Sequence, residues 1–524
     1  MPRPLGRLLI ASLICLSAQG LLTERVLAQK PPPAASQPQA VDADPTQLLI
    51  KSYLSGHNLP PELRTYLLTL LSYAAVQIEP SLTRLWAQEA FQLAFTLPMS
   101  WDRVAHEKNS LAALAQVDPI LAFKLFDSMD TTVPLPSGDI PEDLRAYAAR
   151  TVFQEYWKRE GPAALDVIRR QAARLGDTGQ YPFLAMAPII RDVDRENPVE
   201  AQALFGEALT YYGRGWRTAS TDEEFSRFLQ ELWNAIPLPL KRQALQRMVG
   251  HLTEESEPPH GQVFLSRAYL EKGTVEFRSR AKKLLYSLLP QIREVDPRWA
   301  SQLVEADPAL QRASAASGST SFSEQLMIHN TSGVSSAAIS ALQAMAFQRQ
   351  KLVRIAKLAS TDPSQALALS DALTDRALRA QALAVIAAGL GSKDPGQARS
   401  LIDQVRKDLE SIGGAADRVA VLVALAKAAA ATRDQKLIAE TLERGFDLGE
   451  ELFSEDLDVH PGKAVEDVTG FDSLSDLTAV GVKYAPEYTV PRIERISNDL
   501  LRAHLLMITA ENLFEARRAA VDPH

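Results

Sequence analysis

The segment Tyr211-Tyr-Gly-Arg-Gly-Trp-Arg217 holds the residues whose types and spacing best fit ligand chemistry. Its two glycines predict a break after a helix, and loops at such breaks often carry binding residues. Its aromatic rings could stack on sugars, and its arginines could pair with carboxylates. The candidate ligand-binding residues are therefore Tyr212, Arg214, Trp216 and Arg217. The alternative to ligand binding, which we favour, is that this segment is a long loop between helices and that Trp216 fills the core.

The motifs that would support catalysis or metal binding are incomplete. His106-Glu107 lacks the second histidine that a zinc site needs one helical turn later. His251 and His260 flank glutamates at a polar helix end, which indicates a solvated turn. Ser279-Arg-Ala-Lys282 matches the S-x-x-K motif, in which a lysine can activate a serine nucleophile. The S-D-N and K-T-G motifs that accompany it in such enzymes are missing. We therefore predict no catalytic residue, no metal and no cofactor.

The first 28 residues have the features of a secretory signal. Arg3 and Arg7 precede a short apolar run, residues 8–16, and cleavage is expected after Ala28. The alternative is an uncleaved first helix that anchors the chain in a membrane. Cleavage would remove Cys15, the single cysteine. An exported protein without disulfides is typical of a bacterial envelope, so we predict a periplasmic or extracellular location.

The charge balance argues against nucleic-acid binding. The formal net charge is −8, and loss of three arginines and one glutamate with the signal would make it −10. The basic run at residues 278–283 lies in a helical pattern, and we interpret it as a solvated helix face.

The length and the prolines indicate the architecture. A chain of 524 residues is too long for one core, because single cores stop growing at about 250–300 residues. Apolar residues recur at helical spacing almost throughout, and convincing alternating strands are missing. Aspartate followed by proline favours a helix start, since aspartate caps free amides and proline lacks one. Such starts, with similar Glu-Pro and Gly-Pro pairs, are predicted at Pro45, Pro80, Pro119, Pro162, Pro297, Pro363 and Pro395.

An internal match supports repetition of a helical hairpin. Residues 363–390 align without a gap on residues 486–513, and the second helix of each carries Leu-Arg-Ala. Asp375 and Asn498 occupy the position expected to cap that second helix. The stretch DRALRAQALAVIAAGLGSKDPGQARSLIDQV, residues 375–405, resembles tetratricopeptide and HEAT-type helical repeats. This resemblance implies an all-α fold, a right-handed α-solenoid of stacked helical hairpins in two blocks.

The expected organisation follows composition along the chain. All six Trp lie before residue 300, whereas residues 341–431 are rich in alanine. The predicted parts are a signal peptide at 1–28, a disordered Pro-rich leader at 29–43, an aromatic-rich helical block at 44–308, a Ser/Ala/Gly linker at 309–340, an Ala-rich helical block at 341–515 with an exposed insertion at 445–469, and a tail at 516–524.

Stacked hairpins leave a long surface for a partner, so the function expected from the sequence is binding rather than catalysis. We predict an exported scaffold for a protein partner in the cell envelope, with no nucleic-acid partner and no membrane-spanning segment after cleavage. The alternative is an all-helical envelope enzyme that acts on polysaccharide or peptidoglycan. Such an enzyme would use two catalytic carboxylates, and only their separation in the folded structure could identify them.

Overall fold

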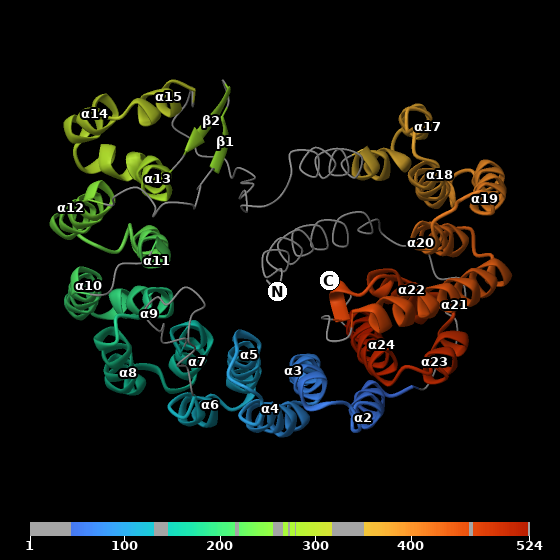
Figure 1. Cartoon of the computed structure of the whole chain (residues 1–524), viewed down its shortest axis with the longest axis horizontal. Coiled ribbons are helices and arrows are strands. Elements are labelled where there is room, and N and C mark those ends of the chain that lie inside the picture. Colours follow the sequence, from blue (N-terminus) through green and yellow to red (C-terminus); the bar gives the residue numbers. More distant parts are fainter. Residues whose placement is uncertain are drawn as a thin grey trace. The chain divides into compact units, whose positions relative to one another are not determined.

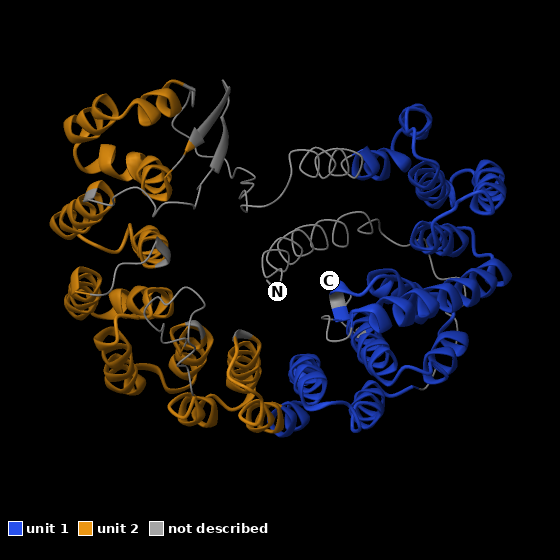
Figure 2. Ribbon diagram, in the orientation of Figure 1, with its two compact units in different colours: residues 1–86, 335–524 blue, residues 87–334 orange. Residues whose placement is uncertain are grey.

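A computed structural model describes residues 43–129, 145–214, 219–254, 266–270, 273–277, 279–316, 351–460 and 465–521. The expected signal, nearly all of the leader and residues 317–340 of the expected linker lie outside these ranges. The described chain is all-α, with many helices packed against one another and one short strand pair (Figure 1). It divides into unit 1, residues 1–86 and 335–524, and unit 2, residues 87–334 (Figure 2).

Unit 1 contains helices from both ends of the chain. They are α2 (Pro45–Ser55), α3 (Pro61–Ile78), the start of α4 (Pro80–Ala94), α17 (Pro363–Asp371), α18 (Arg376–Leu390), α19 (Pro395–Leu409), α20 (Ala415–Ala431), α21 (Gln435–Val459), α22 (Phe471–Tyr484), α23 (Pro486–Glu494) and α24 (Asp499–Val521), with a 3-10 turn η2 (Val465–Asp467). Helices α18, α20, α22 and α24 contact one another in series, and α19, α21 and α23 each pack beside them (Figure 1).

The N-terminal helices α2 and α3 belong to unit 1 because they pack on α24. Lys51 of α2 pairs with Glu494 at 2.5 Å, and Arg502 of α24 donates to the Ser55 hydroxyl at 3.2 Å. The contacts therefore divide the chain differently from the composition, which groups α2 and α3 with the aromatic-rich block. Composition reports local sequence, whereas this docking joins segments far apart along the chain.

The predicted helix starts are largely confirmed. In the five Asp-Pro pairs, proline begins α2, α6 (Pro119–Phe126), α14 (Pro297–Ala306), α17 and α19, and the aspartate side chain accepts a hydrogen bond from a first-turn amide. Glu79-Pro80 begins α4. Gly161-Pro162 instead lies in a 3-10 turn, η1 (Gly161–Ala164), in which Gly161 has a positive φ of 60°.

The internal match corresponds to two helical hairpins that share the length of the first helix but not of the second, since α18 has 15 residues and α24 has 23. Helices α17 and α23 each have nine residues, and α18 and α24 begin at positions that align without a gap. The Asp375 side chain accepts from the Leu378 amide at 2.9 Å, and Asn498 accepts from the Leu501 amide at 3.0 Å. Both predicted caps are therefore present. The matched Leu383 and Leu506 are 2% and 1% exposed, so the shared stripe is the buried face.

Two segments predicted to be irregular contain helix. The expected insertion at 445–469 begins inside α21, where Gly445 and Gly449 are buried. A Cβ atom on either glycine would lie within 2.7 Å of a leucine side chain of α22, so these glycines permit close helix packing instead of breaking the helix. The first eight residues of the expected linker, 309–316, belong to α15 (Pro308–Ala316), in which Ala313 is fully buried.

Unit 2 surrounds a core rich in phenylalanine. Its helices are the end of α4, α5 (Trp101–Val117), α6, α7 (Arg145–Glu160), α8 (Leu165–Asp177), α9 (Phe183–Glu196), α10 (Pro198–Arg214), α11 (Ala219–Glu231), α12 (Leu238–Glu254), α13 (Arg280–Val295), α14 and α15. The antiparallel strands β1 (Ser266–Leu270) and β2 (Gly273–Phe277) pair Ser266 with Phe277. These strands were not expected, because five residues are too few for alternation to stand out.

Candidate functional site

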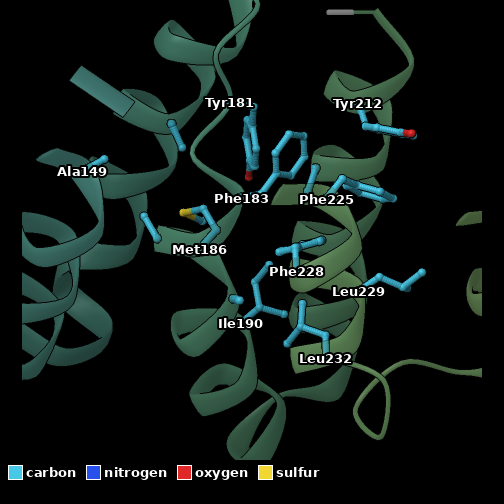
Figure 3. Close-up of a cluster of buried hydrophobic side chains, with 14 of the residues drawn as sticks. Ala149, Tyr181, Phe183, Met186, Ile190, Tyr212, Phe225, Phe228, Leu229 and Leu232 are labelled. Atoms are coloured by element: carbon cyan, nitrogen blue, oxygen red, sulfur yellow. The ribbon is translucent and has the colours of Figure 1, made fainter. Parts of the chain in front are cut away.

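The four residues predicted to bind a ligand do not share one described surface. Tyr212 is 2% exposed and packs inside unit 2, where its ring stacks on Phe225 with centroids 3.9 Å apart (Figure 3). Arg214 is the exposed last residue of α10. Trp216 and Arg217 lie outside the described residues, so the interpretation of Trp216 as a core residue stays a prediction.

Tyr212 belongs to a buried polar cluster that the sequence did not reveal. Its hydroxyl donates to Oδ1 of Asp222 at 2.5 Å, and Nδ1 of His251 lies 4.0 Å from the same oxygen. The three residues come from α10, α11 and α12, so no local spacing connects them. Because a buried carboxylate requires hydrogen-bond donors, this arrangement fixes the relative positions of α10 and α11.

In two of the motifs that resembled catalytic or metal sites, the side chains make ion pairs or helix caps within the fold. Glu107 is fully buried and accepts from Nε of Arg103 at 2.8 Å. Ser279 caps α13 by accepting from the Lys282 amide, while the Lys282 ammonium pairs with Asp307 at 3.2 Å. Within the described ranges, no three side chains of His, Cys, Asp or Glu converge as metal ligands.

The best candidate binding surface is a groove in unit 1 with a volume of about 510 Å³. Helices α19, α20 and α21 form it. We call it the α19–α21 groove, and its lining residues are Asp403, Arg406, Lys407, Leu409, Glu410, Leu422, Leu425, Leu437, Glu440, Thr441 and Arg444. The leucines are buried, whereas the charged side chains are exposed at the rim. The groove therefore combines an apolar floor with a charged edge.

Ion pairs connect the two helices on either side of this groove. Arg444 of α21 pairs with Glu410 of α19 at 2.8 Å, and Arg406 of α19 lies 3.9 Å from Glu440 of α21. The hydrogen bond from Arg444, followed by its charge, lowers the pKa of Glu410. Both pairs are exposed, so they contribute little to stability and can exchange for partners on another molecule.

Local sequence explains each side of the groove but not its assembly. Asp394 caps α19 and Asp434 caps α21, which sets where both helices begin. Between them, α20 is rich in alanine and has no aromatic residue, so it forms a thin floor. Helical periodicity favours burial of apolar residues within each helix, but only the packing of three helices brings the leucines of α19, α20 and α21 to one groove.

No helix in the described part of the chain is long and apolar enough to cross a membrane. The fold and the groove define an all-α protein of many packed helices with a surface groove in unit 1. No protein-family model, no curated protein and no solved structure matches the chain.

Proposed function

We propose that this chain is an exported α-solenoid scaffold, of the tetratricopeptide or HEAT type, that binds a protein partner in the cell envelope without catalysis. The observation that carries the proposal is the α19–α21 groove, which joins an apolar floor to exposed charges of both signs. Surfaces of this kind favour protein segments, since apolar anchors supply affinity and rim charges supply specificity.

Repetition supports the solenoid part of the proposal. The hairpin of α17 and α18 recurs as α23 and α24 with the same length of the first helix, a side-chain cap at the start of the second helix and the same buried stripe. Helices α18, α20, α22 and α24 contact one another in series, and α19, α21 and α23 pack beside them. Stacked hairpins bury their apolar stripes only against each other, and this arrangement is typical of repeat proteins.

The expected occupant of the groove is a segment of the partner with one apolar anchor side chain between an acidic and a basic residue. The anchor would contact the floor near Leu425 and Leu437. The flanking charges would pair with Arg444 and Glu410, whose mutual ion pair is exposed and exchangeable. Because the rim carries both signs, a purely acidic or purely basic segment fits it less well.

A charge reversal of the rim tests this proposal while keeping the ion pair. The wild-type chain without residues 1–28 is used to isolate a stoichiometric protein from envelope extract, and the dissociation constant is then measured with the purified partner. The combined change Glu410→Arg and Arg444→Glu should weaken binding by roughly tenfold or more, because two rim contacts become repulsive.

The matched control reverses another exposed ion pair of unit 1. Lys427 of α20 and Asp476 of α22 lie 3.1 Å apart and do not line the groove. Lys427→Asp combined with Asp476→Lys should leave the dissociation constant unchanged, and both double variants should keep the wild-type unfolding temperature. Equal binding by the groove variant, or glycan turnover by the chain with no protein partner, would contradict the proposal.

A further inference from the structure

The floor of the α19–α21 groove is almost completely covered in this structure. Its leucines come from all three helices and are between 2% and 7% exposed: Leu409, Leu422, Leu425 and Leu437. Thr441 of α21, which also lines the groove, is 3% exposed. The contact between a partner's apolar anchor and this floor, on which the proposed function rests, therefore requires side chains at the rim to move.

The charged side chains of the rim form two ion pairs, one helical turn apart, between α19 and α21. Arg406 precedes Glu410 by four residues at the end of α19, and Glu440 precedes Arg444 by four residues in α21. Residues four apart lie on one face of a helix. The first residues of the two helices, Arg406 and Glu440, are 3.9 Å apart. The second residues, Glu410 and Arg444, are 2.8 Å apart.

These two ion pairs can break without disturbing the core of unit 1. All four side chains are exposed, and exposed ion pairs are weak and screened by salt. Glu440 also lies 3.7 Å from Lys436 of its own helix, which competes with Arg406 for the same carboxylate. Because α19 and α21 both pack on α20, the pairs can part and re-form while the three helices stay in place.

We propose that the Arg406–Glu440 and Arg444–Glu410 ion pairs are straps that keep the groove closed, so that its leucine floor is accessible only when they part. A partner segment with a charge of each sign would replace the straps as its apolar anchor enters, and binding would thereby be coupled to opening. This inference rests on the proposed function and adds its regulation. Salt weakens the straps, so access to the floor increases with ionic strength.

Labelling of a thiol inside the groove measures this opening without a partner. The substitution Thr441→Cys introduces the thiol with little change in volume, at a position that is covered in the closed groove. N-ethylmaleimide is the probe, and peptide mass spectrometry of the full chain distinguishes labelling at residue 441 from labelling at Cys15. At low ionic strength the thiol at residue 441 should react slowly, because only the open groove exposes it.

Two strap variants of the Thr441→Cys chain test the proposal. One combines Glu410→Gln with Glu440→Gln, and the other combines Arg406→Gln with Arg444→Gln. Each should raise the labelling rate about threefold or more, because each removes both straps. Loss of glutamates favours the reactive thiolate and loss of arginines disfavours it, so a change in thiol reactivity alone cannot accelerate labelling in both variants.

The matched control neutralises the exposed ion pair of Lys427 and Asp476, which are 3.1 Å apart and do not line the groove. Lys427→Gln combined with Asp476→Asn should change the labelling rate by less than about twofold. A second reporter, Thr478→Cys, lies at a fully buried position of α22. Its labelling rate should not rise in the strap variants, which separates opening of the groove from unfolding of unit 1.

Added salt should accelerate labelling at residue 441 in the chain with intact straps and have little effect in the two strap variants. The proposal is overturned if either strap variant is labelled at residue 441 no faster than the chain with intact straps, or if labelling at residue 478 rises as much. Because no partner takes part in this measurement, its outcome is independent of whether a protein partner is isolated from the envelope extract.

Discussion

The hydroxyl of Ser52 in α2 donates a hydrogen bond of 2.6 Å to the backbone carbonyl of Ala503 in α24, although 451 residues separate them. Ser52 and Ala503 are both fully buried. Ala503 belongs to the Leu-Arg-Ala segment of the repeated hairpin, so α2 packs directly on a repeat helix. Unit 1 is therefore complete only when the first helices of the chain pack on the last one.

The buried stripe of the repeated hairpin predicts the effect of Leu383→Asp. Leu383 is 2% exposed in α18, so the substitution would bury a carboxylate that has no partner. We expect the free energy of unfolding to fall by at least about 3 kcal/mol, as measured by urea denaturation. Gln381→Asp, at a partly exposed position of the same helix, is the control and should cost much less. Equal effects would contradict the assigned register.

Substitution by alanine at two helical glycines should change the stability of the chain in opposite directions. A Cβ at Gly389 of α18 would lie 2.7 Å from the backbone of Ala359, so Gly389→Ala should destabilise the chain by about 1–3 kcal/mol. Gly206 of α10 has open space around that position, and Gly206→Ala should stabilise by up to about 1 kcal/mol. Thermal unfolding of both variants measures the contrast. A stabilised Gly389→Ala variant would contradict the close helix contact.

The pKa of His106 predicts part of the pH dependence of stability. Burial lowers this pKa, and Asp102 one turn earlier opposes the shift. The folded chain therefore binds a proton at His106 less tightly than the unfolded chain does. The contribution to stability is complete above the ordinary histidine pKa of about 6.5 and is lost as the pH falls from there through the lower folded-state value.

Unfolding in urea at pH 7.5 and at pH 5 measures this effect. The His106→Gln variant should lose less stability between the two pH values than the wild-type chain, because its side chain does not titrate. All other titrating groups are the same in both proteins, so the difference reports His106 together with its interaction with Asp102. An identical loss in both proteins would show that this histidine does not contribute.

The expected signal gives a prediction about the mature protein. If cleavage follows Ala28, chain recovered from a bacterial envelope fraction should begin at Gln29 and contain no thiol, since Cys15 is the single cysteine. Intact-mass measurement and thiol titration check both properties. A full-length chain that remains with the membrane fraction would instead support an uncleaved anchor.

The sequence by itself determined the local structure of this protein. Asp118, Asp362 and Asp394 identified helix starts because a cap is a hydrogen bond between residues only three apart. The spacing of Leu383 and its neighbours identified the buried face because helical periodicity is also local. The match between the two hairpins extended this information to the residue at which the second helix of each begins.

Only the tertiary structure decided which distant segments meet. Gly445 and Gly449 lie in the segment that was expected to be an exposed insertion, yet they pack against leucines of α22. The same holds for Tyr212, whose hydroxyl donates to Asp222 on another helix, and for the ion pair between Glu410 and Arg444 at the rim of the α19–α21 groove. These contacts depend on the complementary shapes of several helices, which no spacing within one helix can encode.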